Sequence, residues 1–161
     1  MTLPENTSPW SLADLFPGHD SPEMKKAFVD LDALLTDFES VRPQLSAAIP
    51  VESFLDIIRR LEVIYSLANR IGSYAGLAFS ASTQDPAIMT FLGNVEQNLA
   101  VMGNRLLFFS LWWKDLPDDE AARLMSASGD YRYWLEEMRH FKPHTLTEPE
   151  EKIINLKNVT G

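Results

Sequence analysis

The fold is decided by residues 86–113, which read PAIMTFLGNVEQNLAVMGNRLLFFSLWW. Apolar residues recur through this stretch in alternating steps of four and three, the spacing of one face of an α-helix. They are Ile88, Leu92, Val95, Leu99, Met102, Leu106, Phe109 and Trp113. Asp85 and Pro86 supply a capping residue and a first-turn proline. At 1.5 Å per residue the helix would be about 42 Å long, which suits a long antiparallel hairpin.

The segment that follows Pro50 and reaches Ser80 shows two apolar stripes and a row of small residues. The stripes are Phe54, Ile58, Leu61 and Tyr65 on one side, and Ile57, Ile64, Leu67 and Ile71 on the other. Two stripes indicate a helix that is buried on two sides. The small residues Ala68, Gly72, Gly76 and Ser80 recur every four positions.

Each mid-helix glycine costs about 1 kcal/mol relative to alanine, so the row of small residues needs a compensating contact. We expect the helix of residues 86–113 to approach it closely, at Gly76 in particular, where leucine would then be destabilising. The alternative is a break near Gly72 or Gly76 that divides the segment into two helices. The short polar connection from Ser80 to Asp85 favours an antiparallel pair.

Further helices are predicted on both sides of this pair. Ser21 and Pro22 start one, whose apolar face comprises Met24, Phe28, Leu31, Leu35 and Phe38 and which Pro43 ends. Residues 118–127 and 131–141 predict two shorter helices. Thr147 and Glu150 have the spacing of a capping box at the start of another. No strand alternation is present, so the predicted class is all-α, with long antiparallel helical hairpins in an elongated bundle.

The 161 residues are enough for one domain. We expect residues 1–20 to form a docking arm, in which Trp10 to Phe16 is apolar and Pro17-Gly18 makes a turn. Residues 21–141 would form the helical bundle. Residues 147–161 would begin one more helix.

Composition excludes several function classes. The net charge of -9 disfavours nucleic acid and anionic lipid as partners. Zero cysteines exclude disulfides and thiolate chemistry. The N-terminus lacks the basic and apolar regions of a secretory signal, and no stretch is long and apolar enough to span a bilayer, so we expect a cytoplasmic, non-membrane protein.

The three histidines are the natural places to look for a metal or acid-base site. His140 and His144 have the spacing of a zinc helix, but Pro143 separates them and no glutamate follows His140. Glu137 and His140 form one Glu-x-x-His unit, whereas a di-iron bundle needs two. His19 stands far away in the sequence. A solvated polar helix face is the favoured interpretation, and no catalytic, cofactor-binding or metal-binding residue is assigned.

Phe108 and Trp112 lie off the apolar stripe of their helix. They are candidates for a second packing layer or a functional surface, although core packing is the commoner use of such aromatics. The sequence contains no glycine-rich phosphate loop and no Gly-x-Ser-x-Gly elbow, which excludes phosphate-transfer and serine-nucleophile sites of those types.

Several segments, in order, resemble the oligoendopeptidase F-like branch of the thimet-oligopeptidase family of zinc metallopeptidases. They are WSLADLF at 10–16, SASTQDP at 80–86, FFSLWW at 108–113, YWLEEMR at 133–139 and KPHTLTEPEEKIIN at 142–155. The last is similar to the "Pro-His-x-Leu-Ser/Thr-Glu-x-Glu-Glu" segment that closes the N-terminal helical domain of that family. The resemblance spans nearly the whole chain but includes no catalytic motif.

The resemblance implies a zinc peptidase that hydrolyses short peptides, with this helical domain as one wall of the substrate channel. Zinc would be held by a His-Glu-x-x-His helix and a downstream glutamate, none of which this chain contains, so it should be inactive alone. Its partner would be its own C-terminal catalytic domain. Without that partner we expect self-association through Phe108, Trp112, Ile153, Ile154 and Leu156. The alternative is a free-standing helical scaffold or interaction module without catalysis.

Overall fold

The computed structural model describes residues 11–160, including all side chains in that range except those of residues 156 and 158–160. It is all-α, as predicted, and the described residues contain no β-strand. The α-helices are α1 (Pro22–Glu39), α2 (Val51–Ala81), α3 (Pro86–Asp115), α4 (Asp118–Ser126), α5 (Arg132–His140) and α6 (Glu148–Thr160). Three short 3-10 helices connect them: η1 (Arg42–Gln44), η2 (Gly129–Tyr131) and η3 (Lys142–His144).

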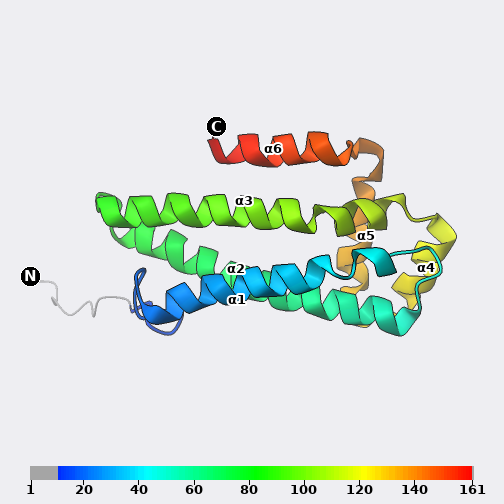
Figure 1. Ribbon diagram of the computed structural model, residues 1–161, viewed down its shortest axis with the longest axis horizontal. Coiled ribbons are helices and arrows are strands. Elements are labelled where there is room, and N and C mark those ends of the chain that lie inside the picture. Colours follow the sequence, from blue (N-terminus) through cyan, green and yellow to red (C-terminus); the bar gives the residue numbers. More distant parts are fainter. Residues whose placement is uncertain (1–10, 161) are drawn as a thin grey trace, which may run out of the picture.

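The long helices run lengthwise along an elongated bundle (Figure 1). Helix α2 is antiparallel to both α1 and α3, and α6 returns along α3 in the opposite direction. Helices α4 and α5 lie together at one end, where α5 runs across the long axis. No described helix is both long and apolar enough to cross a membrane.

The start of α1 follows its sequence signals. Ser21 Oγ accepts a hydrogen bond from the backbone N–H of Met24 at 3.1 Å, and Pro22 occupies the first helical position. The predicted apolar face is buried except for Phe28, which is half-buried. Within the expected arm, Phe16 is only 2% exposed and packs edge-on against Tyr74, with the ring centroids 5.7 Å apart. Trp10 and the residues before it lie outside the described residues.

Helix α2 is continuous through both glycines, so the alternative of a break near Gly72 or Gly76 is wrong. The close contact with α3 is real but lies at Gly72. A Cβ atom placed there would lie 3.3 Å from Leu99 Cδ1, whereas a Cβ at Gly76 would meet nothing within 4 Å. The expectation of a tight contact at Gly76 is therefore wrong. The register of α3 places a leucine opposite one small residue and leaves the next uncovered.

Gly76→Ala should therefore raise the free energy of unfolding by up to about 1 kcal/mol, because it gains helix propensity without a clash. Gly72→Ala should raise the free energy of unfolding by less, because the end of the Leu99 side chain must move to make room for the new methyl group. Urea denaturation followed by circular dichroism at 222 nm compares the two variants with the parent. A lower midpoint for Gly76→Ala would contradict the open space at that position.

The far end of α3 is anchored in the core. The predicted stripe of α3 is buried or half-buried along its length. Trp113 at its end is fully buried, stacks on Phe54 at 5.3 Å between centroids, and donates its Nε1–H to the carbonyl oxygen of Leu135 at 2.9 Å. This side chain thus ties α3 to both α2 and α5.

Arg105 joins α3 to α1. Its Nη1 lies 2.6 Å from Asp32 Oδ1, and its Nε and Nη2 each lie 2.8 Å from an oxygen of Glu39. Nη2 also donates to Thr36 Oγ1 at 2.9 Å. These hydrogen bonds hold the pKa of Glu39 below its usual value and raise the pKa of Arg105.

Because the pKa of Glu39 is lowered by folding, its stabilising contribution is complete above the usual value of 4.5 and is lost as the pH falls through the folded value. The unfolding free energy of the parent should fall as the pH is lowered from about 5 to about 3. In Glu39→Gln this fall should be smaller, because the titrating carboxyl group is absent. Urea melts across this range test it, with Glu23→Gln, an exposed residue of the same helix, as control. Identical pH profiles for the parent and Glu39→Gln would refute the coupling to Arg105.

Candidate functional site

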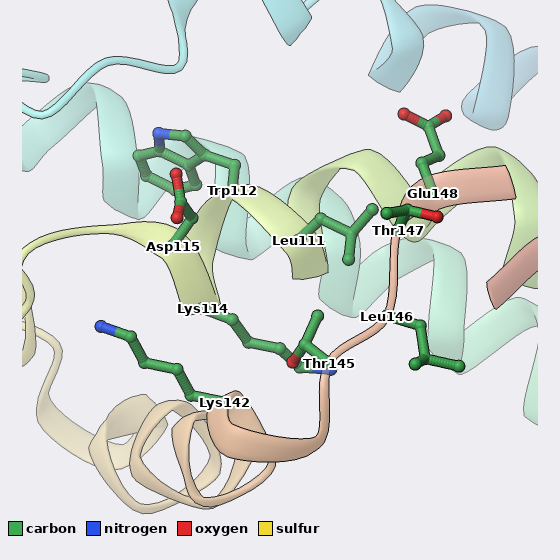
Figure 2. A pocket seen from close by; sticks show the side chains of 9 residues that line it. All are labelled: Leu111, Trp112, Lys114, Asp115, Lys142, Thr145, Leu146, Thr147 and Glu148. Atoms are coloured by element: carbon green, nitrogen blue, oxygen red, sulfur yellow. The ribbon is translucent and has the colours of Figure 1, made fainter. Parts of the chain in front are cut away.

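An open cleft of about 550 Å³ lies between the last turns of α3 and the connection that leads from α5 into α6 (Figure 2). It is lined by Leu111, Trp112, Lys114, Asp115, Lys142, Thr145, Leu146, Thr147 and Glu148. Its two walls are therefore the C-terminal end of α3 and residues 142–148, which are far apart in the sequence.

The 142–148 wall is fixed by its own hydrogen bonds. Pro143 lies in η3, just after α5 ends, and Thr145 Oγ1 donates to the carbonyl oxygen of Phe141 at 3.0 Å. At the start of α6, Glu150 Oε2 accepts from the backbone N–H of Thr147 at 2.9 Å and from its hydroxyl at 2.6 Å. These two hydrogen bonds form the Glu150 half of the predicted capping box, and they hold the pKa of Glu150 below its usual value.

Some of the charges in the cleft are already paired. Lys142 Nζ lies 3.3 Å from Asp118 Oδ1. The carboxylate of Glu148 lies 2.7 Å from Lys152 Nζ and 3.5 Å from Arg42 Nη2, and these cations lower its pKa. The pairs with Asp118 and Arg42 join residues of different elements, and the pair with Lys152 lies within α6. A ligand could reach these charges only by exchange of partners.

Other groups in the cleft are unpaired. Within the described part of the chain, Lys114 and Asp115 form no ion pair or side-chain hydrogen bond. Figure 2 shows Lys114 extending from α3 toward the 142–148 wall, whereas Asp115 lies beside Trp112. Trp112 and Leu111 are half-buried and add apolar surface. The cleft can hold a polar chain by ion pairs and apolar contact.

The lining of the cleft contains two hydroxyl groups and no histidine. Its hydroxyl groups, on Thr145 and Thr147, both donate to oxygen acceptors of the protein itself. None of its lining residues is a histidine that could take a proton from them. An adjacent base of this kind is one of the ways in which a protein activates a hydroxyl nucleophile.

None of the three histidines belongs to a cluster of potential metal ligands among the described residues. His140 Nδ1 lies 3.2 Å from Glu137 Oε1 on an exposed face of α5, and His144 is exposed in η3. His19 packs near Phe91, with the ring centroids 5.7 Å apart. No group of three or more potential ligands occurs within residues 11–160, so the described residues do not fit a zinc ion.

The two off-stripe aromatics have different environments. Phe108 is only 5% exposed, because the guanidinium of Arg42 lies 4.5 Å from its ring centroid and Phe38 packs beside it at 5.6 Å. The expectation that Phe108 is exposed is therefore wrong, since η1 folds back over it. Trp112 is half-buried and reaches the cleft.

The unpaired Lys114 and Asp115 were not predicted from the sequence. They follow the aromatic pair at the end of α3, and isolated charges there are usual in a solvated last turn. Only the return of the chain at η3 makes them part of a cleft. The helix-ending Lys142-Pro143-His144 was the one sequence signal for that return.

Comparison with protein families gives a match for the C-terminal part of the chain. Residues 112–161 match the family model Peptidase_M3_N, described as Oligopeptidase F. No curated protein and no solved structure matches the chain. All the residues that line the cleft except Leu111 belong to the matched segment. For residues 112–161, this match supports the resemblance to the oligoendopeptidase F-like peptidases found in the sequence.

Proposed function

We propose that this chain is the non-catalytic N-terminal helical domain of a zinc metallopeptidase that hydrolyses short peptides, and that it forms one wall of the substrate channel. The observation that carries this function is the overlap between the family match and the cleft. The segment that matches the family model also builds an open groove that contains the aromatic ring of Trp112. In the same groove, Lys114 and Asp115 pair with none of the described residues. Such a surface suits the passage of short polar chains.

The zinc site and its catalytic residues would lie in a C-terminal catalytic domain outside this chain. Residues 11–160 offer no cluster of ligands that fits zinc. The role of this domain would be to support the catalytic domain and to restrict access to its active site. Folded proteins would be excluded by the walls of the channel, while short peptides would pass.

The test compares this chain with the complete protein encoded by its reading frame. A continuation with His-Glu-x-x-His should bind one zinc ion per chain and cleave short fluorogenic peptides, whereas this chain alone should do neither. Elemental analysis after dialysis and a peptide cleavage assay measure the two properties. One zinc per chain in the present protein would refute the non-catalytic role. A reading frame that stops after Gly161 would favour the free-standing scaffold instead.

The outer face of α6 is the surface we propose for the contact with the catalytic domain. Ile153 is 64% exposed and Ile154 is 42% exposed, and both lie within the family match. Exposed apolar residues of this kind tend to find partners. Leu156, the third residue expected in this set, has a side chain outside the described ones.

In the isolated chain the same face should cause self-association. We expect the weight-average mass in light scattering to rise with concentration, and Ile153→Lys to shift it toward the monomer. Val29→Lys is the matched control, because Val29 is 68% exposed on α1. A monomeric mass at high micromolar concentration, or an equal effect of both variants, would refute this role of α6.

A further inference from the structure

A second groove, of about 200 Å³, lies on the outside of α2 where η2 and α5 pack against it. It is lined by Ile58, Leu61, Glu62, Tyr65, Tyr131 and Trp134. The two aliphatic residues are buried, whereas Tyr65 is 40% exposed and Trp134 is half-buried. Glu62 is the only charged residue in this lining. The groove is therefore an apolar slot with aromatic sides and one carboxylate.

The carboxylate of Glu62 is held in place but not neutralised. Tyr131 Oη donates to Glu62 Oε2 at 2.6 Å, and this hydrogen bond raises the pKa of the tyrosine. Within the described residues Glu62 forms no ion pair, and its other oxygen, Oε1, accepts no hydrogen bond. One negatively charged oxygen is thus left for a ligand.

Two further hollows meet the groove at Glu62, which lines all three. One, of about 340 Å³, extends past Leu55 to η2 and carries Arg59 and Asp130. The other, of about 550 Å³, extends between α1 and α2 past Val63 and ends at Arg70. Arg70 is engaged by the carbonyl oxygen of Leu15 and the ring of Phe16. The two hollows therefore continue the surface along α2 on both sides of Glu62.

We propose that the Glu62 groove binds the side chain of a lysine residue presented by a peptide segment. The apolar floor accepts the methylene groups, the aromatic rings attract the ammonium group, and Glu62 Oε1 pairs with it. Lysine fits better than arginine because an ammonium group can pair with a single carboxylate oxygen, whereas a guanidinium group binds a carboxylate best through both oxygens. One of the two oxygens, Oε2, already accepts a hydrogen bond from Tyr131. The flanking hollows would hold the residues on either side of the lysine.

The test titrates acetyl-Ala-Lys-Ala-amide into this chain and follows the indole N–H signal of Trp134 by NMR. The same peptide with norleucine in place of lysine lacks only the charge, and butylamine supplies the charge without the peptide. We expect millimolar binding of the lysine peptide, with the norleucine peptide and butylamine each about three- to tenfold weaker. Because the measurement needs no catalytic activity, it is independent of the peptidase assignment.

Variants separate the groove from general charge attraction. Glu62→Gln should lower the affinity for the lysine peptide to that for the norleucine peptide. Tyr131→Phe tests the hydrogen bond that holds the carboxylate of Glu62. Glu96→Gln, an exposed glutamate of α3, is the matched control and should change nothing. Circular dichroism confirms that each variant is folded. Absence of binding at 10 millimolar (roughly the weak limit for one such contact), equal binding of the three probes, or no effect of Glu62→Gln would overturn the assignment.

Discussion

Trp113→Ala should lower the free energy of unfolding by about 3–5 kcal/mol, the usual cost of removing a large buried aromatic side chain. The residue is fully buried, and the change removes both the stack on Phe54 and the hydrogen bond to Leu135. The adjacent Trp112 provides a control of equal size. Because Trp112 is half-buried at the cleft, Trp112→Ala should cost much less.

Urea denaturation followed by circular dichroism gives the comparison without relying on tryptophan fluorescence. Similar midpoints for the two alanine variants would show that the two indoles contribute equally, contrary to the burial described here. Trp113→Phe separates the two contributions of the side chain. It keeps most of the apolar volume but removes the donor to Leu135, so an intermediate loss of stability is expected.

The second large effect is expected at Arg139, which closes the C-terminal end of α3 from α5. Its Nη1 donates to the carbonyl oxygen of Trp113 at 2.6 Å, and its Nη2 donates to that of Leu116 at 2.9 Å and also contacts Asp118. Its side chain is only 11% exposed. Arg139→Met should cost about 2–3 kcal/mol, because it removes charged donors from two partly buried carbonyl groups.

Arg132→Met is the matched control for Arg139→Met. Arg132 lies on the same helix, but its side chain is 63% exposed and pairs only with Glu136. Exposed pairs of this kind contribute little. Equal losses of stability in the two variants would show that the carbonyl contacts of Arg139 do not hold α5 to α3.

Periodicity in the sequence was sufficient to predict the long helices and the buried face of α3. A stripe in strict four-three spacing fixes which side of a helix is buried, whatever the neighbouring helix is. The start signal at Ser21-Pro22 was equally local, and the structure confirms it. Local chemistry of this kind is independent of the tertiary fold.

The errors concern contacts between segments that are far apart in the sequence. The close approach of α3 to the small residues of α2 was correctly predicted at Gly72 and wrongly predicted at Gly76. Only the register of the two helices determines that Leu99 lies opposite Gly72 and that Gly76 is uncovered. Phe108 was predicted to be exposed, but η1 folds back and places Arg42 over its ring. No periodic pattern in the sequence indicates this fold-back. The cleft depends in the same way on the return of the chain at η3.

The position of α6 also has a consequence for the order in which the chain folds and opens. Helices α1, α2 and α3 are successive hairpin neighbours, so their contacts close short loops, whereas α6 packs mainly on α3 after the intervening α4 and α5. Short-range contacts form faster than long-range ones. The three-helix core should therefore assemble first, and α6 should dock last. In the native protein α6 would then detach and exchange its amide hydrogens while α1–α3 remain protected, as a separate cooperative unit.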